Sequence, residues 1–220
     1  MKTEITRQEL LARIHSRLDG NPSGPRTSTE FPDQAWPSQE EMVAQFVAAL
    51  ERASGRVYRA ANAGEARERL IQVLRQSQAQ RIVWAEGSSL SDLALDSLNG
   101  EFHMTCATDL GNSVRDVLAQ TDVGITGADY AIAETGTLLL CAHPAMPRLL
   151  SALTTVHVAV VQVNQLFPTF AHLAPVVRKQ AIAVSHMTLI TGPSRTGDIE
   201  QVITIGAHGP RELHVILRAA

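Results

Sequence analysis

Residues 56–85, which read RVYRAANAGEARERLIQVLRQSQAQRIVWA, decide the fold class of this chain. An apolar, β-branched run at 56–60 is followed by a segment with helical spacing at 63–76, and a second apolar run follows at 81–85. This order of strand, helix and strand is typical of a parallel sheet that helices cover. The stretch therefore predicts an α/β protein.

The same alternation continues toward the C-terminus. Further strands are predicted at 102–107, 122–126, 137–142, 157–163, 187–191, 202–205 and 213–217, with helices at 89–98, 112–120 and 169–181. Together they indicate a mostly parallel sheet flanked by helices on both faces. Because three of the last strands follow one another closely, we expect an antiparallel edge or hairpin to close the sheet.

The first 54 residues have a different character from the rest. Residues 5–18 have the apolar spacing of a short amphipathic helix, and 19–37 are rich in proline and glycine, which is typical of an extended linker. Ser38 and Glu41 have the spacing of a capping box, so a second helix is predicted to begin there and to stop at Gly55. We therefore expect an N-terminal helical extension with its linker at 1–54 and an α/β domain at 55–220.

Composition excludes several classes of protein. The chain has 220 residues, 19 Lys and Arg against 22 Asp and Glu, and a net charge of -3, which does not suit a protein that neutralises nucleic-acid phosphates. No apolar run approaches the roughly 20 residues of a membrane-spanning helix, and no secretory signal is visible, so a cytoplasmic protein is expected. Two isolated cysteines, Cys106 and Cys141, cannot supply an iron–sulfur cluster or a four-ligand zinc site. We expect no metal and no resident cofactor.

The familiar phosphate-binding loops do not occur. No GxGxxG motif follows a predicted strand, which argues against a standard dinucleotide site. Residues 192–197 have the glycine spacing of an ATP loop, but Asp198 stands where that loop needs its lysine, and an acid there would repel phosphate.

The first candidate site is the stretch DVGITGADYAIAETGT at 122–137. A strand is expected to end at Thr126, and a short helical segment with Asp129 near its start is expected to lead to Glu134. Ligands of open α/β sheets bind outside the carboxyl ends of the strands. The candidate residues are Glu134 as a catalytic acid or base, and Thr126, Asp129, Thr135 and Thr137 as substrate-binding residues. The alternative is that Asp129 caps a helix and Glu134 is a solvated surface acid.

Two further loops carry candidate residues. Arg195 lies between Ser194 and Thr196, and a guanidinium beside hydroxyl groups suits a carboxylate or phosphate, although Arg195 could instead pair with Asp198 or Glu200.

In the third loop, at 206–214, His208 between two glycines is a candidate catalytic acid or base, and Arg211 can add a second positive charge. The alternative for His208 is a turn histidine held by a backbone carbonyl. His157, inside an apolar strand, is expected to be a core residue. The other histidines share no metal-ligand spacing.

Segments 124–138, 190–200 and 206–214 together resemble the lactate-utilisation (LUD) domain family, in particular its short C-type members. The likeness spans about residues 55–220 and departs at Gly197, where relatives usually carry Ala. It implies a Rossmann-like fold similar to ribose-5-phosphate isomerase and CoA transferases. It also implies a place beside two iron–sulfur partner proteins, a reductase-like subunit and a larger LUD protein, which together support oxidation of L-lactate to pyruvate. The resemblance assigns no catalytic residues.

The favoured hypothesis is a subunit of a lactate-oxidising system that binds a small carboxylate and passes electrons through its iron–sulfur partners. Whether this chain is itself an enzyme stays open. One alternative is a non-catalytic assembly protein whose N-terminal helix and linker dock those partners. Another is an isomerase-like enzyme that acts on sugar phosphates, because the loops would also suit phosphate.

Overall fold

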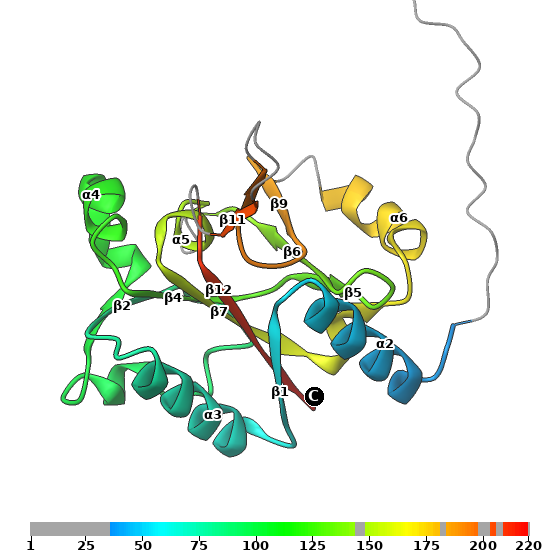
Figure 1. Cartoon of the computed structure of the whole chain (residues 1–220), viewed down its shortest axis with the longest axis horizontal. Coiled ribbons are helices and arrows are strands. Elements are labelled where there is room, and N and C mark those ends of the chain that lie inside the picture. Colours follow the sequence, from blue (N-terminus) through cyan, green and yellow to red (C-terminus); the bar gives the residue numbers. More distant parts are fainter. Residues whose placement is uncertain (1–35, 144–147, 181–183, 198–202, 206–208, 220) are drawn as a thin grey trace, which may run out of the picture. The chain divides into compact units, whose positions relative to one another are not determined.

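The structure, a computed structural model, describes residues 36–143, 148–180, 184–197, 203–205 and 209–219 (Figure 1). The helix expected at 5–18 and most of the expected linker at 19–37 lie outside the described residues. The described residues belong to one compact unit that begins at Gln34. The boundary expected at residue 54 therefore falls inside this unit.

A six-stranded sheet forms the centre of the fold, with the strand order β1-β12-β7-β4-β2-β3 and every neighbouring pair parallel. Its strands are β1 (Arg56–Ala60), β2 (Arg81–Trp84), β3 (His103–Cys106), β4 (Val123–Gly127), β7 (Val156–Gln162) and β12 (Glu212–Arg218). This confirms the mostly parallel α/β fold. The predicted antiparallel closing edge is wrong for β12, which lies between β1 and β7 inside the sheet.

Two smaller sheets accompany the main one. The first has the order β8-β5-β6-β9, with strands β5 (Tyr130–Ile132), β6 (Thr137–Cys141), β8 (Leu166–Phe167) and β9 (Met187–Ile190). In the second, β10 (Arg195–Gly197) pairs antiparallel with β11 (Ile203–Ile205). The closely spaced C-terminal strands thus belong to three different sheets, because β9 pairs with β6 and β12 with the main sheet.

The longer helices begin where the sequence provides caps. Both capping-box bonds of Ser38 and Glu41 are present at the start of α2 (Gln39–Arg52), and the Asn62 side chain accepts from Glu65 N at the start of α3 (Ala63–Gln76). The other helical elements are η1 (Leu95–Leu98), η2 (Ala107–Ser113), α4 (Val114–Leu118), α5 (Leu150–Leu153), η3 (Val163–Gln165) and α6 (Phe170–Gln180). No helix in these described ranges is long and apolar enough to cross a membrane.

Two helices predicted from the sequence are wrong in extent. Residues 89–98 form turns and the short 3₁₀ segment η1, and the helix expected at 112–120 shortens to α4. Leu90, Leu93, Leu95 and Leu98 are buried, so their apolar spacing serves a compact loop as well as it would serve a helix. Periodicity shows which side is buried, but in a short segment it does not fix the backbone.

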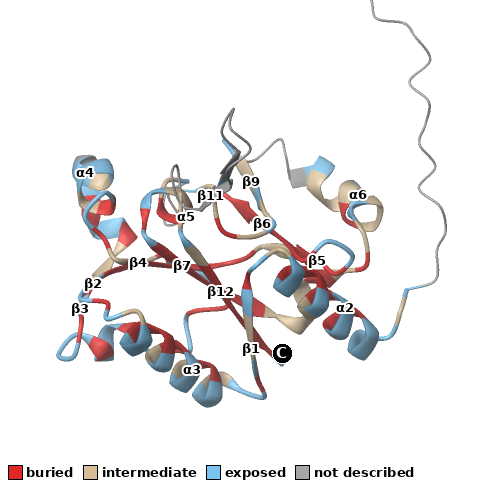
Figure 2. Ribbon diagram, viewed as in Figure 1, coloured by how far each residue is buried: buried red, intermediate tan, exposed pale blue. Residues whose placement is uncertain are grey.

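Both faces of the main sheet are buried, and alternate residues of each strand serve different cores. Ile216 joins the core under α3, whereas Val215 and Leu217 join the core that α2 shares with β5 and β6. Figure 2 shows the buried residues along the central strands, with exposed residues on the outer sides of α2 and α3. Phe46 and Leu50 of α2 have no exposed surface, so α2 is part of this core.

Candidate functional site

The order in which the strands of the main sheet are connected creates a switch point at the carboxyl ends of β2 and β4. The chain passes from β2 outward to β3 at the edge, then returns to β4 on the other side of β2 and continues to β7. The loops after β2 and β4 therefore leave in opposite directions. Such a switch point opens a crevice in parallel sheets, and ligands bind there in open α/β folds.

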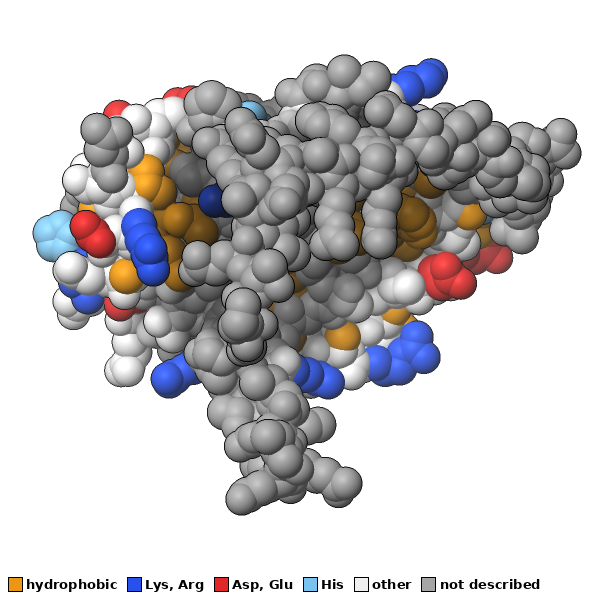
Figure 3. Space-filling view, turned by 90° about the horizontal axis from the view of Figure 1, so that it is seen from above, with side chains coloured by type: hydrophobic (Ala, Val, Ile, Leu, Met, Phe, Trp, Pro, Cys, Tyr) orange, Lys and Arg blue, Asp and Glu red, His pale blue; other side chains and the backbone are white. Residues whose placement is uncertain are grey.

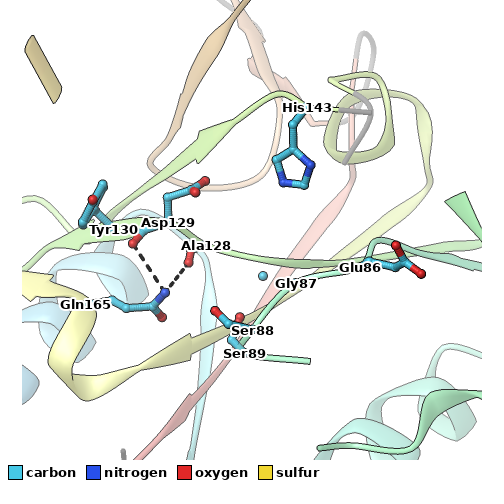
Figure 4. Close-up of a pocket in the computed structure, with 10 residues that line it drawn as sticks. Glu86, Gly87, Ser88, Ser89, Ala128, Asp129, Tyr130, His143 and Gln165 are labelled. Carbon is cyan, nitrogen blue, oxygen red and sulfur yellow. Dashed lines mark hydrogen bonds between the residues drawn. The ribbon is translucent and has the colours of Figure 1, made fainter. Parts of the chain in front are cut away.

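A cavity of about 270 Å³ lies at this switch point (Figure 4). This volume is near the lower end of the range of about 300–1,000 Å³ that is usual for small-molecule sites. In Figure 4, His143 lies across the cavity from Ser88 and Ser89, and the Glu86 side chain points away. The lining residues are Glu86, Gly87, Ser88, Ser89, Gly127, Ala128, Asp129, Tyr130, His143 and Gln165.

Ser89 gives the cavity a polar group that the protein itself does not use. The residue is 2% exposed, it lines the cavity, and no other described residue hydrogen-bonds its hydroxyl. A Cβ added to Gly127 would lie 2.5 Å from the Ser89 Oγ, so only glycine lets β4 approach this closely. The Ser89 Oγ at the cavity wall can therefore donate a hydrogen bond to a bound molecule.

The opposite wall of the cavity is held in place by hydrogen bonds. The Asp129 carboxylate accepts from Cys141 N at 2.7 Å, and the Gln165 side-chain amide donates to Ala128 O at 2.5 Å. The Gln165 Oε1 accepts from Gln162 N at 2.7 Å. Burial, followed by the charge of Asp129, raises the pKa of the Cys141 thiol to about 11, so this cysteine stays protonated. The helical segment predicted to begin near Asp129 is wrong, because strand β5 stands there.

Thr126 lies one residue before the cavity, but its side chain is engaged elsewhere. Its hydroxyl is 2.8 Å from the Nε2 of His157, and both residues are buried. Burial lowers the pKa of His157 to about 4, so the ring is neutral at pH 7. The prediction of a core histidine at 157 is confirmed.

Glu134, Thr135 and Thr137 lie at the other end of the β5–β6 hairpin from Asp129. About 13 Å of extended chain separates Asp129 from Ala133, at roughly 3.3 Å per residue. Glu134 is exposed, and its backbone amide donates to Pro168 O at 3.0 Å. Thr137 Oγ1 lies 2.6 Å from the Thr135 hydroxyl and 2.9 Å from the Thr191 hydroxyl. The structure thus joins this loop to the segment at Thr191.

Arg195 lies against the C-terminal end of α2. Its Nη2 donates to Ala53 O at 3.0 Å and to Ser54 Oγ at 2.5 Å. A positive charge at the C-terminal end of a helix interacts favourably with the helix dipole. The possible partners Asp198 and Glu200 are outside the described residues, as is the Thr196 side chain.

The described part of the third loop lies beside the second. Ser194 N donates to Pro210 O at 2.8 Å, and Arg211 N donates to Thr155 O at 2.8 Å, just before β7 begins. Arg211 is therefore at the amino edge of the main sheet, and Asp129 at the carboxyl edge. His208 is outside the described residues. Among the described candidates, the structure links the loops of Thr137, Arg195 and Arg211 in pairs, and it places Thr126 and Asp129 at the other edge of the main sheet.

Sequence reasoning missed most of the cavity. The sequence predicts a helix from residue 89 and does not single out His143 or Gln165 as candidate site residues. The available signal was Gly87-Ser88-Ser89, three small residues directly after a buried strand. Such residues let a backbone approach a ligand closely, but only the strand order shows that this strand borders the switch point.

The described part of the surface shows neither a basic patch nor a cluster of metal ligands that would indicate a further site. In Figure 3, basic and acidic side chains are interspersed around the visible face and do not gather in one basic area. Across the described ranges, no three His, Cys, Asp or Glu side chains are grouped so that they could hold a metal ion.

Comparison with known proteins places this parallel α/β fold in a family. The chain matches the LUD domain family over residues 43–217 and belongs to it. A solved structure of a DUF162 family protein from Deinococcus radiodurans shares the fold, with a TM-score of 0.61 and 20% identity over 83% of this chain and 99% of that one.

Curated relatives are more specific in name. Lactate utilization protein C of Anoxybacillus flavithermus is 27% identical over 212 residues, which cover 92% of this chain and 94% of that protein. The protein of the same name from Halalkalibacterium halodurans is 33% identical over 104 residues, 46% of this chain and 45% of that protein.

Proposed function

We propose that this protein acts in lactate utilisation and binds a small carboxylate, L-lactate or pyruvate, in the cavity at the carboxyl ends of β2 and β4. The observation that carries the proposal is the likeness to lactate utilization protein C along 92% of the chain. The position of the cavity at the switch point of the sheet supports the choice of site.

The groups around the cavity suit a small hydroxylated or keto acid. The Ser88 and Ser89 hydroxyls can donate to carboxylate oxygens, and His143 is the lining residue that can carry positive charge or move a proton. Glu86 points away from the cavity, and the Asp129 carboxylate accepts a hydrogen bond from Cys141 N. His143 is then placed to take the proton of the lactate hydroxyl.

Oxidation of lactate to pyruvate releases two electrons and two protons, which need an acceptor. The chain has two cysteines, too few for the thiolates of an iron–sulfur cluster. We therefore assign the electrons to iron–sulfur partner proteins and the carboxylate to this subunit.

Isothermal titration calorimetry with L-lactate and with pyruvate tests the site. We expect Ser89→Ala and His143→Ala to weaken binding by about ten- to a hundredfold each, because one charge-assisted hydrogen bond is worth roughly 1.5–3 kcal/mol. Arg195→Ala is the matched control outside the cavity and should bind as the wild type does.

Two results would contradict the proposal. If Arg195→Ala abolishes binding while His143→Ala does not, the carboxylate binds at the loop of Arg195. If the wild type binds neither acid, and a strain that lacks the protein still grows on L-lactate, the role in lactate utilisation fails as well.

A further inference from the structure

The loop that carries Ser88 and Ser89 has little regular structure to hold it. After β2 ends at Trp84, the bonds within the turn include Leu90 N to Gly87 O at 3.0 Å, Ser91 N to Gly87 O at 3.1 Å and Ser91 Oγ to Ser88 O at 3.2 Å. Leu90 and Leu93 are buried and attach one side of the loop to the core. A binding site on such a loop needs further support to keep its geometry.

That support comes from the last strand of the main sheet. Arg218, the final residue of β12, places its Nη1 at 2.7 and 2.8 Å from the two carboxylate oxygens of Asp92. Asp92 is three residues beyond Ser89 in the chain. The Arg218 side chain is 8% exposed and that of Asp92 46% exposed, so the charge of the arginine is held mostly inside the protein.

A second arginine holds the far end of the same loop. Arg67 of α3 donates from Nη1 to Leu93 O at 2.8 Å and to Ala94 O at 3.1 Å, and from Nη2 to Ser97 Oγ at 2.8 Å. Ala94 has a φ of 47°, a left-handed conformation that a residue with a side chain adopts only where its surroundings enforce it. The loop is thus fixed from two separate elements.

Stability alone does not explain the pair of Arg218 and Asp92. The Arg218 Nε is buried and has no hydrogen-bond partner among the described residues. Burying an arginine that is only partly satisfied costs free energy, and apolar residues of similar size often stabilise such positions as well or better. Because the pair fixes one arrangement of two distant segments, we look for its role in what it holds in place.

We propose that Arg218 and Asp92 are positioning residues, which hold the loop of Ser88 and Ser89 at the cavity at the carboxyl ends of β2 and β4. Their effect on a carboxylate ligand rests on the proposed function, but their effect on the loop does not. Substitution of this pair should therefore make the loop more mobile and weaken the binding of the ligand.

Three variants separate positioning from stability. Asp92→Asn leaves the buried guanidinium without a counter-ion and can prevent folding, so the double variant Arg218→Met with Asp92→Asn is the main test. Glu101→Gln is the control, since it breaks the exposed ion pair with Arg75, whose side chains are 64% and 44% exposed. Each is compared with wild type by thermal unfolding, amide hydrogen exchange and pyruvate calorimetry.

For the double variant we expect a melting temperature near that of the wild type, about tenfold faster exchange at 86–91, and about tenfold weaker pyruvate binding. Exchange within α3 and every property of Glu101→Gln should stay unchanged. Unchanged exchange at 86–91 in a folded double variant would overturn the positioning role. If the wild type binds no pyruvate, the proposed function fails, and the exchange measurement still decides whether the pair holds the loop.

Discussion

Two polar regions of this protein use similar residues in opposite ways. At the C-terminal end of α2, hydroxyl groups and a guanidinium are bonded within the protein, as in the contacts among Thr135, Thr137 and Thr191 and those of Arg195 with the helix end. At the carboxyl edge of β2 and β4, the Ser89 hydroxyl and the His143 ring face an open cavity.

The difference teaches that a cluster of polar residues in the sequence does not by itself indicate a cavity. Polar groups in a loop are satisfied by the protein, by water or by a ligand, because burying them without any partner is costly. The region at the end of α2 is satisfied from within, so its first role is to join a hairpin, a loop and a helix. The region at the carboxyl edge has bonding capacity to spare.

The largest effect on stability should come from a methyl group added at Gly136, in the turn that packs against the C-terminal end of α2. Gly136 has a φ of 66°, and a Cβ there would lie 2.7 Å from the Leu50 Cα. We expect Gly136→Ala to lower the free energy of unfolding by about 3–4 kcal/mol, measured by urea denaturation. Gly87→Ala is the matched control at the cavity, where a Cβ meets nothing within 4 Å, and should change it by less than about 0.5 kcal/mol. Equal costs would remove the contrast.

A second effect should be a loss of unfolding free energy at acid pH, caused by His157. Burial lowers the pKa of His157 from 6.5 to about 4, so the unfolded chain takes up its proton first as the pH falls. The contribution is complete above pH 6.5, is lost between pH 6.5 and 4, and amounts to about 3 kcal/mol.

Urea denaturation at pH 7, 5.5 and 4 measures this loss. His157→Gln keeps a side-chain group for Thr126 but does not titrate, so its stability should fall less over this range. The same pH profile in both proteins would show that other groups cause the acid sensitivity.

A smaller effect is expected when the hydroxyl at Thr137 is removed. Thr137→Val keeps the shape of a buried side chain but breaks both of its hydroxyl contacts, which should cost about 1–2 kcal/mol of unfolding free energy. Pyruvate binding, measured by calorimetry, should not change. Loss of binding without loss of stability would move the site from the carboxyl edge to this region.

The smallest effect is expected at Glu134. The residue is exposed, and its described bond is made by its backbone amide, so Glu134→Gln should change the unfolding free energy by less than about 0.5 kcal/mol. A turnover assay of the reconstituted lactate-oxidising system with this variant tests its predicted catalytic role. Full activity would assign Glu134 to the surface.

The sequence predicted correctly those features that depend on residues close together in the chain, and it failed where distant residues decide the structure. The capping box at Ser38 and the strand, helix and strand of 56–85 are confirmed, because neighbouring residues decide them. The predicted helix at 89–98 is wrong because its leucines are buried by the sheet in a loop that Arg67 and Arg218 hold from outside.

The sequence by itself determined the α/β class, the positions of most strands, the core position of His157 and the balanced charge. Only the tertiary structure decided that β12 lies inside the sheet, that Arg195 contacts the end of α2, and that the loop at 86–89 borders a cavity. The physical reason is that spacing along the chain reports which side of an element is buried. Which element covers that side depends on packing between distant residues, as between Asp92 and Arg218, which are 126 positions apart.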